Sequence, residues 1–176
     1  MKKLLLVAML STALTSPALA AQETKYLVVD INRVIGTSNA MNQVNKEVEE
    51  YRVKNAKEFE KKEQELRAED ENLKKEEATL APDAFQKKVR EFRTKFAEVG
   101  RSATAKREQM DKAFNTALTQ LNTEAEKIIQ DIAKENGAEI IFASHQLLYA
   151  NENLNKSEEV LKRLNAKVSK IKIDLK

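Results

Sequence analysis

The feature that most constrains this chain is a helical stretch from residue 40 to residue 136 with one interruption, the turn Leu-Ala-Pro-Asp at residues 80–83. At about 1.5 Å of rise per residue, the two predicted arms, 40–79 and 84–136, would reach roughly 60 to 80 Å. A chain of 176 residues cannot build a compact monomer around rods of that length. We therefore expect the arms to fold back on each other, and we expect function to depend on that shape.

Both arms carry the apolar spacing of a coiled coil. In the second arm, apolar residues recur in alternating steps of four and three, the pattern of a helical seam. The first arm begins in the same way, but farther along only every seventh residue is apolar. The seam residues are Met41, Val44, Val48, Tyr51, Phe59, Leu66, Leu73 and Leu80 in the first arm, and Phe85, Val89, Phe92, Phe96, Val99 and Ala103 in the second.

The position of the turn predicts which residues face each other, because the numbers of opposed residues should add to 165. Leu73 then faces Phe92, which supports an antiparallel hairpin over two separate helices. Val89 and Phe96 face glutamates instead. These two residues lack an apolar partner in the other arm, so we expect them to be exposed.

The heptad phase breaks in both arms, after Val48 and at Met110. Four-residue insertions of this kind locally unwind a supercoil. The breaks lie at one level, with residues 51–55 facing 110–114, which indicates either a moving part or an ordinary irregular coiled coil. Gly100 lies within the second helix, where glycine costs about 1 kcal/mol relative to alanine. It is a candidate hinge, although close helix packing is the slightly favoured explanation.

Five apolar residues of the second arm are candidates for contact with a bound chain or for arm flexing. Core packing is the alternative for each, and it is favoured for Phe92 and Phe114 because both have apolar partners in the fold-back. The five residues are Val89, Phe92, Phe96, Met110 and Phe114.

The N-terminus has the pattern of a cleavable signal peptide. Two lysines precede the apolar run 4–10, and Ala18-Leu19-Ala20 forms a small-residue cleavage site before Ala21. The run is too short to span a bilayer, although a membrane anchor is the alternative. We predict export to the periplasm and no integral membrane segment.

The chain thus divides into a signal peptide at 1–20, an arm at 40–136, and a body formed by 21–39 plus 137–176. The body is predicted to contain a strand at 26–31 and a β-hairpin of 138–143 and 146–150. Such a sheet would have open edges and a thin core, so several copies should join to close them. We therefore predict an obligate oligomer.

Three further features of the body are local. Asn136-Gly137 is a helix stop, since glycine accepts the left-handed conformation of a C-terminal cap. Ser157 is the predicted N-cap of a short helix through Asn165. The basic tail beyond it, 166–176, alternates apolar and charged residues as a strand does, although a frayed end explains it equally well.

The composition excludes most catalytic chemistry. The chain has no cysteine and a single histidine, His145, which we place in a loop. No phosphate-binding glycine loop, metal-ligand spacing or nucleophile elbow is present, so we predict no enzyme, cofactor or metal. Removal of the signal peptide leaves 29 basic and 28 acidic residues. A nearly neutral exported chain without a basic groove argues against nucleic acid as a partner.

At this point the residues resemble the Skp/OmpH family of periplasmic chaperones, and the resemblance covers the whole mature chain. It rests on the strand before the first helix, on the long charged hairpin and on three segments that follow it. The strand is 27–30 (Leu-Val-Val-Asp), and the three later segments are 137–142 (Gly-Ala-Glu-Ile-Ile-Phe), 148–150 (Leu-Tyr-Ala) and 157–165 (Ser-Glu-Glu-Val-Leu-Lys-Arg-Leu-Asn).

The resemblance implies a mostly α fold of the α+β class, in which long helical hairpins project from a small β-rich body in a homotrimer. It implies an ATP-independent holdase that keeps unfolded outer-membrane proteins in a cavity between the arms, and it points to the outer-membrane assembly machinery as a further partner. Three departures stand out: Lys156 where an apolar residue is expected, a longer tail, and less basic arms. Because the arms are less basic, we do not extend the family's binding of lipopolysaccharide to this chain.

Two other functions fit parts of the pattern. A structural spacer of the cell envelope would use the arms as rods and would have a fully sealed seam. An envelope enzyme would depend on His145, its only imidazole.

Overall fold

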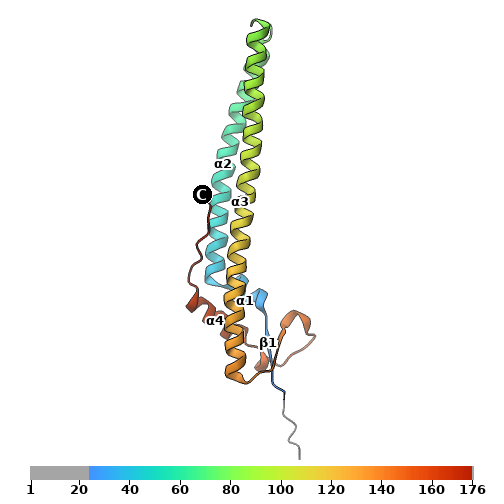
Figure 1. The fold of residues 1–176 in the computed structure, drawn as a ribbon, viewed down its shortest axis with the longest axis vertical. Coiled ribbons are helices and arrows are strands. Elements are labelled where there is room, and N and C mark those ends of the chain that lie inside the picture. The colour runs from blue at the N-terminus through green and yellow to red at the C-terminus, as the bar shows by residue number, and fades with distance from the viewer. Residues whose placement is uncertain (1–23, 176) are drawn as a thin grey trace, which may run out of the picture.

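The computed structural model describes residues 24–175, and the predicted signal peptide at 1–20 lies outside that range. Two long helices dominate the fold, and two short strands lie at their base (Figure 1). In chain order the elements are β1 (Tyr26–Val29), α1 (Ile31–Thr37), α2 (Asn39–Glu76), α3 (Pro82–Asn136), β2 (Ile140–Ala143), two 3₁₀ turns (Ser144–Gln146 and Glu152–Leu154) and α4 (Ser157–Lys167).

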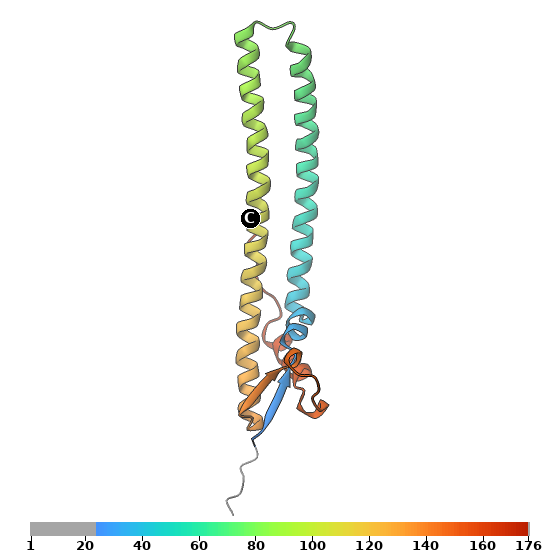
Figure 2. The same ribbon diagram turned by 90° about the vertical axis from the view of Figure 1, so that its right-hand side faces the viewer.

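Helices α2 and α3 form the predicted antiparallel hairpin, as the two perpendicular views show (Figures 1 and 2). They contain 38 and 55 residues. Pro82 is the first residue of α3, where its missing N–H costs nothing because that donor has no intrahelical partner. Gly137 ends α3 with a φ of 64°, as predicted from its freedom to adopt a left-handed cap.

A short helix links the first strand to the arm. Asp30 caps α1, because its carboxylate accepts a hydrogen bond from the backbone N–H of Arg33 at 3.0 Å. Ser38 separates α1 from α2, and its buried hydroxyl accepts from the N–H of Met41. Both caps satisfy donors that a helix start otherwise leaves free.

The predicted β-hairpin at 138–150 is wrong. Strand β2 pairs in parallel with β1, so that Tyr26 lies beside Ile140 and Val29 beside Ala143. Parallel strands need a long crossover, and here the whole arm supplies it. The chain then enters a 3₁₀ turn, and residues 147–150 form an irregular loop. The remaining edge of β1 is occupied by another segment, because Val28 bridges to Asn155.

The start of α4 differs by one position from the predicted cap. Ser157 is the first residue of the helix, and Asn155 accepts a hydrogen bond from its N–H at 3.0 Å. The Ser157 hydroxyl instead accepts a bond from the backbone N–H of Asp30 at 2.8 Å. This serine therefore ties α4 to the end of β1 rather than capping its own helix, and the helix continues to Lys167.

The hydrophobic core lies at the base of the arm. It combines β1, α1, the first turns of α2, the second half of α3, and α4. The core members are Leu27, Val29, Val34, Ile35, Ala40, Met41, Val44, Ala117, Leu121, Ala125, Ile128, Ile132, Val160, Leu164 and Ile171.

The last core member belongs to the C-terminal tail. After α4 the chain reverses and runs back beside the arm, ending partway along it (Figures 1 and 2). Ile171 is only 6% exposed, and Val168 and Ile173 pack against the same core. The tail is therefore a packed extended segment, not a frayed end.

Candidate functional site

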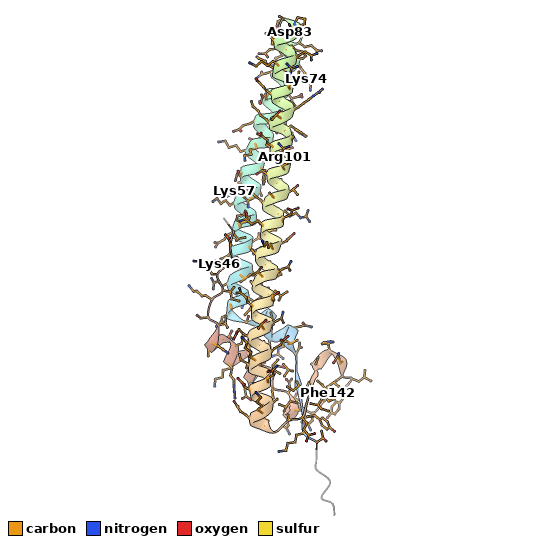
Figure 3. All side chains as sticks on the ribbon, in the orientation of Figure 1. Lys46, Lys57, Lys74, Asp83, Arg101 and Phe142 are labelled. Atoms are coloured by element: carbon orange, nitrogen blue, oxygen red, sulfur yellow. The ribbon has the colours of Figure 1, made fainter. Side chains whose placement is uncertain are left out.

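The distal arm differs from its base in how little it buries. Figure 3 shows side chains standing out around both helices along the whole arm, from the body with Phe142 to the tip with Asp83. Between residues 56 and 112, Leu73 is the only buried apolar side chain. A long part of the arm therefore presents its side chains to the surroundings instead of to a core.

Two of the candidate residues lie where the fold-back predicts an unmatched seam. Phe96 is 63% exposed, while Val89 is half-buried. The glutamates opposite them pair with the preceding lysines: Lys88 contacts Glu76 at 2.6 Å and Lys95 contacts Glu69 at 2.8 Å. In both pairs the residue numbers add to 164, within one of the predicted sum. Ion pairs thus hold helices α2 and α3 in register without covering the aromatic ring of Phe96.

The neighbouring ring of Phe92 is half-buried. Its centroid lies 6.4 Å from that of Phe96, which is within the range of favourable aromatic contact. The hydrogen bond to Glu69 raises the pKa of Lys95, the residue that precedes Phe96 in the chain. The two rings form an apolar patch on the surface of the distal arm.

A polar cluster connects helices α2 and α3 near the predicted change of heptad phase. Lys106 donates hydrogen bonds to Asn55 at 2.7 Å and to Glu58 at 2.6 Å. Its ammonium also lies 5.5 Å from the ring centroid of Phe59, which favours a cation. Hydrogen bonds from Lys106 and Lys62 lower the pKa of Glu58 to about 2. Asn55 is buried, so this level of the seam is held by polar groups.

A mainly apolar hollow of about 280 Å³ adjoins the polar cluster. Tyr51, Phe59, Ala103 and Met110 contribute to its lining. The Tyr51 hydroxyl donates to the Gln109 side chain at 3.1 Å, a pair whose residue numbers add to 160. The predicted facing of residues 51–55 with 110–114 therefore holds only approximately at this level, because the Lys106–Asn55 numbers add to 161 and the Lys106–Glu58 numbers to 164.

The remaining two candidates, Phe114 and Gly100, lie apart from the contacts described above. Phe114 packs against the core at the base of the arm, in agreement with the favoured alternative for it. Gly100 is exposed, and a Cβ added there would meet no atom within 4 Å. The favoured explanation of close helix packing at Gly100 is therefore wrong, and its role as a hinge stays a prediction.

The body carries an exposed apolar surface that the sequence analysis did not identify. It is formed by one face of the two strands and by the loop that follows them, with Tyr26 and Phe142 ring centroids 6.0 Å apart. Prediction of 146–150 as a paired strand concealed it, although two large apolar residues beside a turn could have signalled a surface. Its members are Tyr26, Ile140, Phe142, Leu148 and Tyr149, the last two 108% and 84% exposed.

His145 lies exposed in a 3₁₀ turn, as predicted for a loop residue. No group of three or more metal-binding side chains gathers anywhere in residues 24–175. Within the same range, none of the helices has the length and apolar character needed to cross a membrane.

Comparisons with protein families, curated proteins and solved structures relate this fold to known proteins. The family model of the outer membrane protein (OmpH-like) matches residues 25–164. A search of curated proteins found no match. Among solved structures, a proposed outer membrane chaperone (OmpH-like) from Caulobacter crescentus aligns with a TM-score of 0.78 and 17% sequence identity, over 96% of each chain. At that identity the likeness concerns the fold. Because the family match spans strands, arm and α4 together, the chain belongs to the OmpH-like family.

Proposed function

We propose that this protein is an ATP-independent holdase of the periplasm, which binds unfolded outer-membrane β-barrel proteins between its arms and prevents their aggregation. Its family membership supports this assignment, as does its structural likeness to a proposed outer membrane chaperone. The observation that carries the proposal is the distal arm, where Phe96 is 63% exposed beside a row of ion pairs and almost no apolar side chain is buried.

The chemistry of that arm suits a client without fixed structure. Isolated apolar groups among charges offer weak contacts, and several arms acting together raise the overall affinity through effective concentration. Barrel strands alternate apolar and polar residues, so their unfolded chains present both kinds of group along their length. Binding through many weak contacts would shield such a chain and still let it move.

The body supports the predicted homotrimer. Segment 155–156 covers one edge of β1, which leaves the outer edge of β2 as the edge where another strand could add. Unpaired edges and exposed apolar surface are typical of interfaces between subunits. We propose that Tyr26, Ile140, Phe142, Leu148 and Tyr149 form the contact between copies, which would hold the arms around a shared cavity.

The structural spacer is the weaker alternative. A rod that binds no chain has no need to expose aromatic side chains, and a sealed seam would make it stiffer. The exposed ring of Phe96 and the hollow beside Met110 argue for the chaperone.

Suppression of aggregation is the test. A urea-unfolded outer-membrane β-barrel protein is diluted into buffer with one trimer per client, and light scattering is followed. We expect the mature wild type to suppress scattering and the double variant Val89→Ser, Phe96→Ser to lose at least half of that effect. Equal suppression by a folded double variant would remove these residues from the site.

A matched control uses two exposed positions on the same helix. Arg90→Ser together with Ala97→Ser changes the surface by a similar amount one residue farther round, and it should leave suppression intact. Sedimentation of each protein checks assembly, and Leu148→Ser with Tyr149→Ser should dissociate the trimer. Complete absence of suppression by the wild type would favour the spacer.

A further inference from the structure

The C-terminal tail, which lies beyond the family match, occupies a groove along the arm. The family match ends at residue 164, and the extended segment 168–175 continues beyond α4. Both views show it returning beside the arm (Figures 1 and 2). An ion pair of 3.1 Å between Lys167 and Glu124 holds the point where the tail leaves α4.

Burial along the tail alternates with a period of two. Ile171 is buried and Ile173 and Leu175 are half-buried, whereas Lys170, Lys172 and Asp174 are exposed. This is the periodicity of a β-strand with one covered face. The covering surface is a helix, however, because the tail lies along α3 and takes no part in the two-stranded sheet.

The surface beneath the tail combines small side chains with polar and charged ones, Glu108, Gln109 and Lys112 among them. Ala105, Ala113 and Thr116 of α3 line a hollow of about 590 Å³ together with Ile173, and a second hollow lies nearer to α4. The tail therefore rests in the groove without filling it. A segment seated in this way can be replaced by another of similar pattern.

We propose that this groove is a binding site for extended segments of alternating apolar and polar residues, and that the tail occupies it in place of a client. The inference rests on the proposed function for the identity of the client, because transmembrane β-strands of unfolded barrel proteins have that alternation. The tail itself shows that a segment of this pattern fits the groove.

Tethering gives the tail an advantage over a single free segment. A short linker holds a segment at an effective concentration in the millimolar range, so a weak ligand in solution does not displace it. A long client already held by the distal arms has a comparable advantage and can displace the tail. The groove then opens mainly to chains that the arms have captured.

The test uses a labelled peptide with the sequence of residues 168–176 as the probe. Thr116 and Lys172 are exposed and line the same hollow, so Thr116→Cys with Lys172→Cys allows the tail to be closed over the groove with a short cleavable bismaleimide. The chain has no other cysteine. We compare this protein before linking, after linking and after cleavage with a truncation that ends at Lys167.

We expect the truncated protein to bind the peptide at least tenfold more tightly than the full chain, and the linked protein to bind it least. Cleavage of the linker should restore the original affinity. A peptide with Ile171→Ser and Ile173→Ser is the control and should not bind. If the truncation unfolds because Ile171 belongs to the core, the linked and cleaved forms still decide the question. Equal peptide binding by those two forms would overturn the proposal.

The same proteins separate this inference from the proposed function. Unfolded barrel protein is added to the wild type, the linked form and the cleaved form, and light scattering is measured. If the wild type suppresses scattering and the linked form suppresses it at least twofold less, both the holdase function and the groove site are supported. Suppression that linking leaves unchanged overturns the groove but not the holdase. Failure of the wild type to suppress, with the peptide still bound by the truncated protein, rejects the holdase alone.

Discussion

The base of the arm and its distal part are made of the same two helices but are stabilised differently. At the base, α3 packs against α1, α2, α4 and the tail, and buries Leu121 and Ile132 completely. Over most of the distal part α2 and α3 pack only on each other, and Leu73 is the single buried apolar residue between 56 and 112. Packing on several sides produces a fixed core, whereas two charged helices produce a surface that can adapt.

Ion pairs replace packing in the distal part. Many lie within one helix, such as Arg67 with Glu63 at 2.8 Å and Lys74 with Asp70 at 2.6 Å. Exposed pairs of this kind are individually weak and are screened by salt. The distal arm should therefore open locally at a lower free energy than the base, as mobile binding elements generally do.

The largest expected effect comes from truncating the core at the base. Leu121→Ala should lower the free energy of unfolding by about 2–5 kcal/mol, because it leaves a cavity in a fully buried site. Leu66→Ala, at a half-exposed position of the distal seam, should cost less than about 1 kcal/mol. Chemical denaturation at equal protein concentration measures both. Similar losses would mean that the two regions do not differ as described.

The next effect concerns the polar cluster between the regions. Asn55→Ala removes a buried acceptor from Lys106 and should destabilise this level by about 1–2 kcal/mol. Amide exchange should accelerate around residues 51–59 and 103–110 and stay unchanged in α4. Gln64→Ala, at an exposed position of the same helix, is the control. Uniform acceleration through the base would show that the arm unfolds as one unit.

Gly100→Ala should have a smaller effect of the opposite sign. The added Cβ meets nothing within 4 Å, so the substitution should stabilise the distal helix by about 0.5–1 kcal/mol. Slower amide exchange on both sides of residue 100 is the expected readout. Gly36→Ala, which also places its Cβ in open space, is the control at the base. If Gly100 is a hinge, only its substitution should alter client suppression.

The smallest effect is a dependence on pH. Hydrogen bonds from Lys106 and Lys62 hold the pKa of Glu58 at about 2, below its ordinary value of 4.5. A lowered carboxylate pKa adds stability above the ordinary value, and that stability is lost as pH falls toward the folded value. Protection of the mid-arm amides should therefore fall between about pH 5 and 2. Glu58→Gln should flatten that decrease, and an unchanged decrease would assign it to other carboxylates.

The arm was largely predictable because its information is local and periodic. The heptad spacing and the position of Pro82 set the cross-arm register, and the Lys88–Glu76 pair agrees with it within one residue. At the phase break the register is looser than predicted, since Lys106 reaches both Asn55 and Glu58 and Tyr51 contacts Gln109. The glutamates opposite Val89 and Phe96 predicted exposure of both residues; Phe96 is exposed, but Val89 is half-buried.

The body was predicted less well because its contacts join segments distant in sequence. Residues 146–150 have strand-like composition, but the edge of β1 is occupied by Asn155, more than a hundred residues away from its partner Val28. Serine is a common N-cap residue, yet the Ser157 hydroxyl accepts a hydrogen bond from the backbone N–H of Asp30. Neither choice is visible in local spacing, since both depend on which segments the completed arm brings together.

The amino-acid sequence by itself determined the hairpin, its register and the thin distal seam, because helix periodicity and a single turn leave few alternatives. Only the tertiary structure decided the parallel pairing of β1 with β2, the exposed apolar surface around Leu148 and the position of the tail. The tail illustrates the reason. Its alternating residues suit a strand, and α3 offered it a surface of mixed small and polar side chains that no local pattern describes.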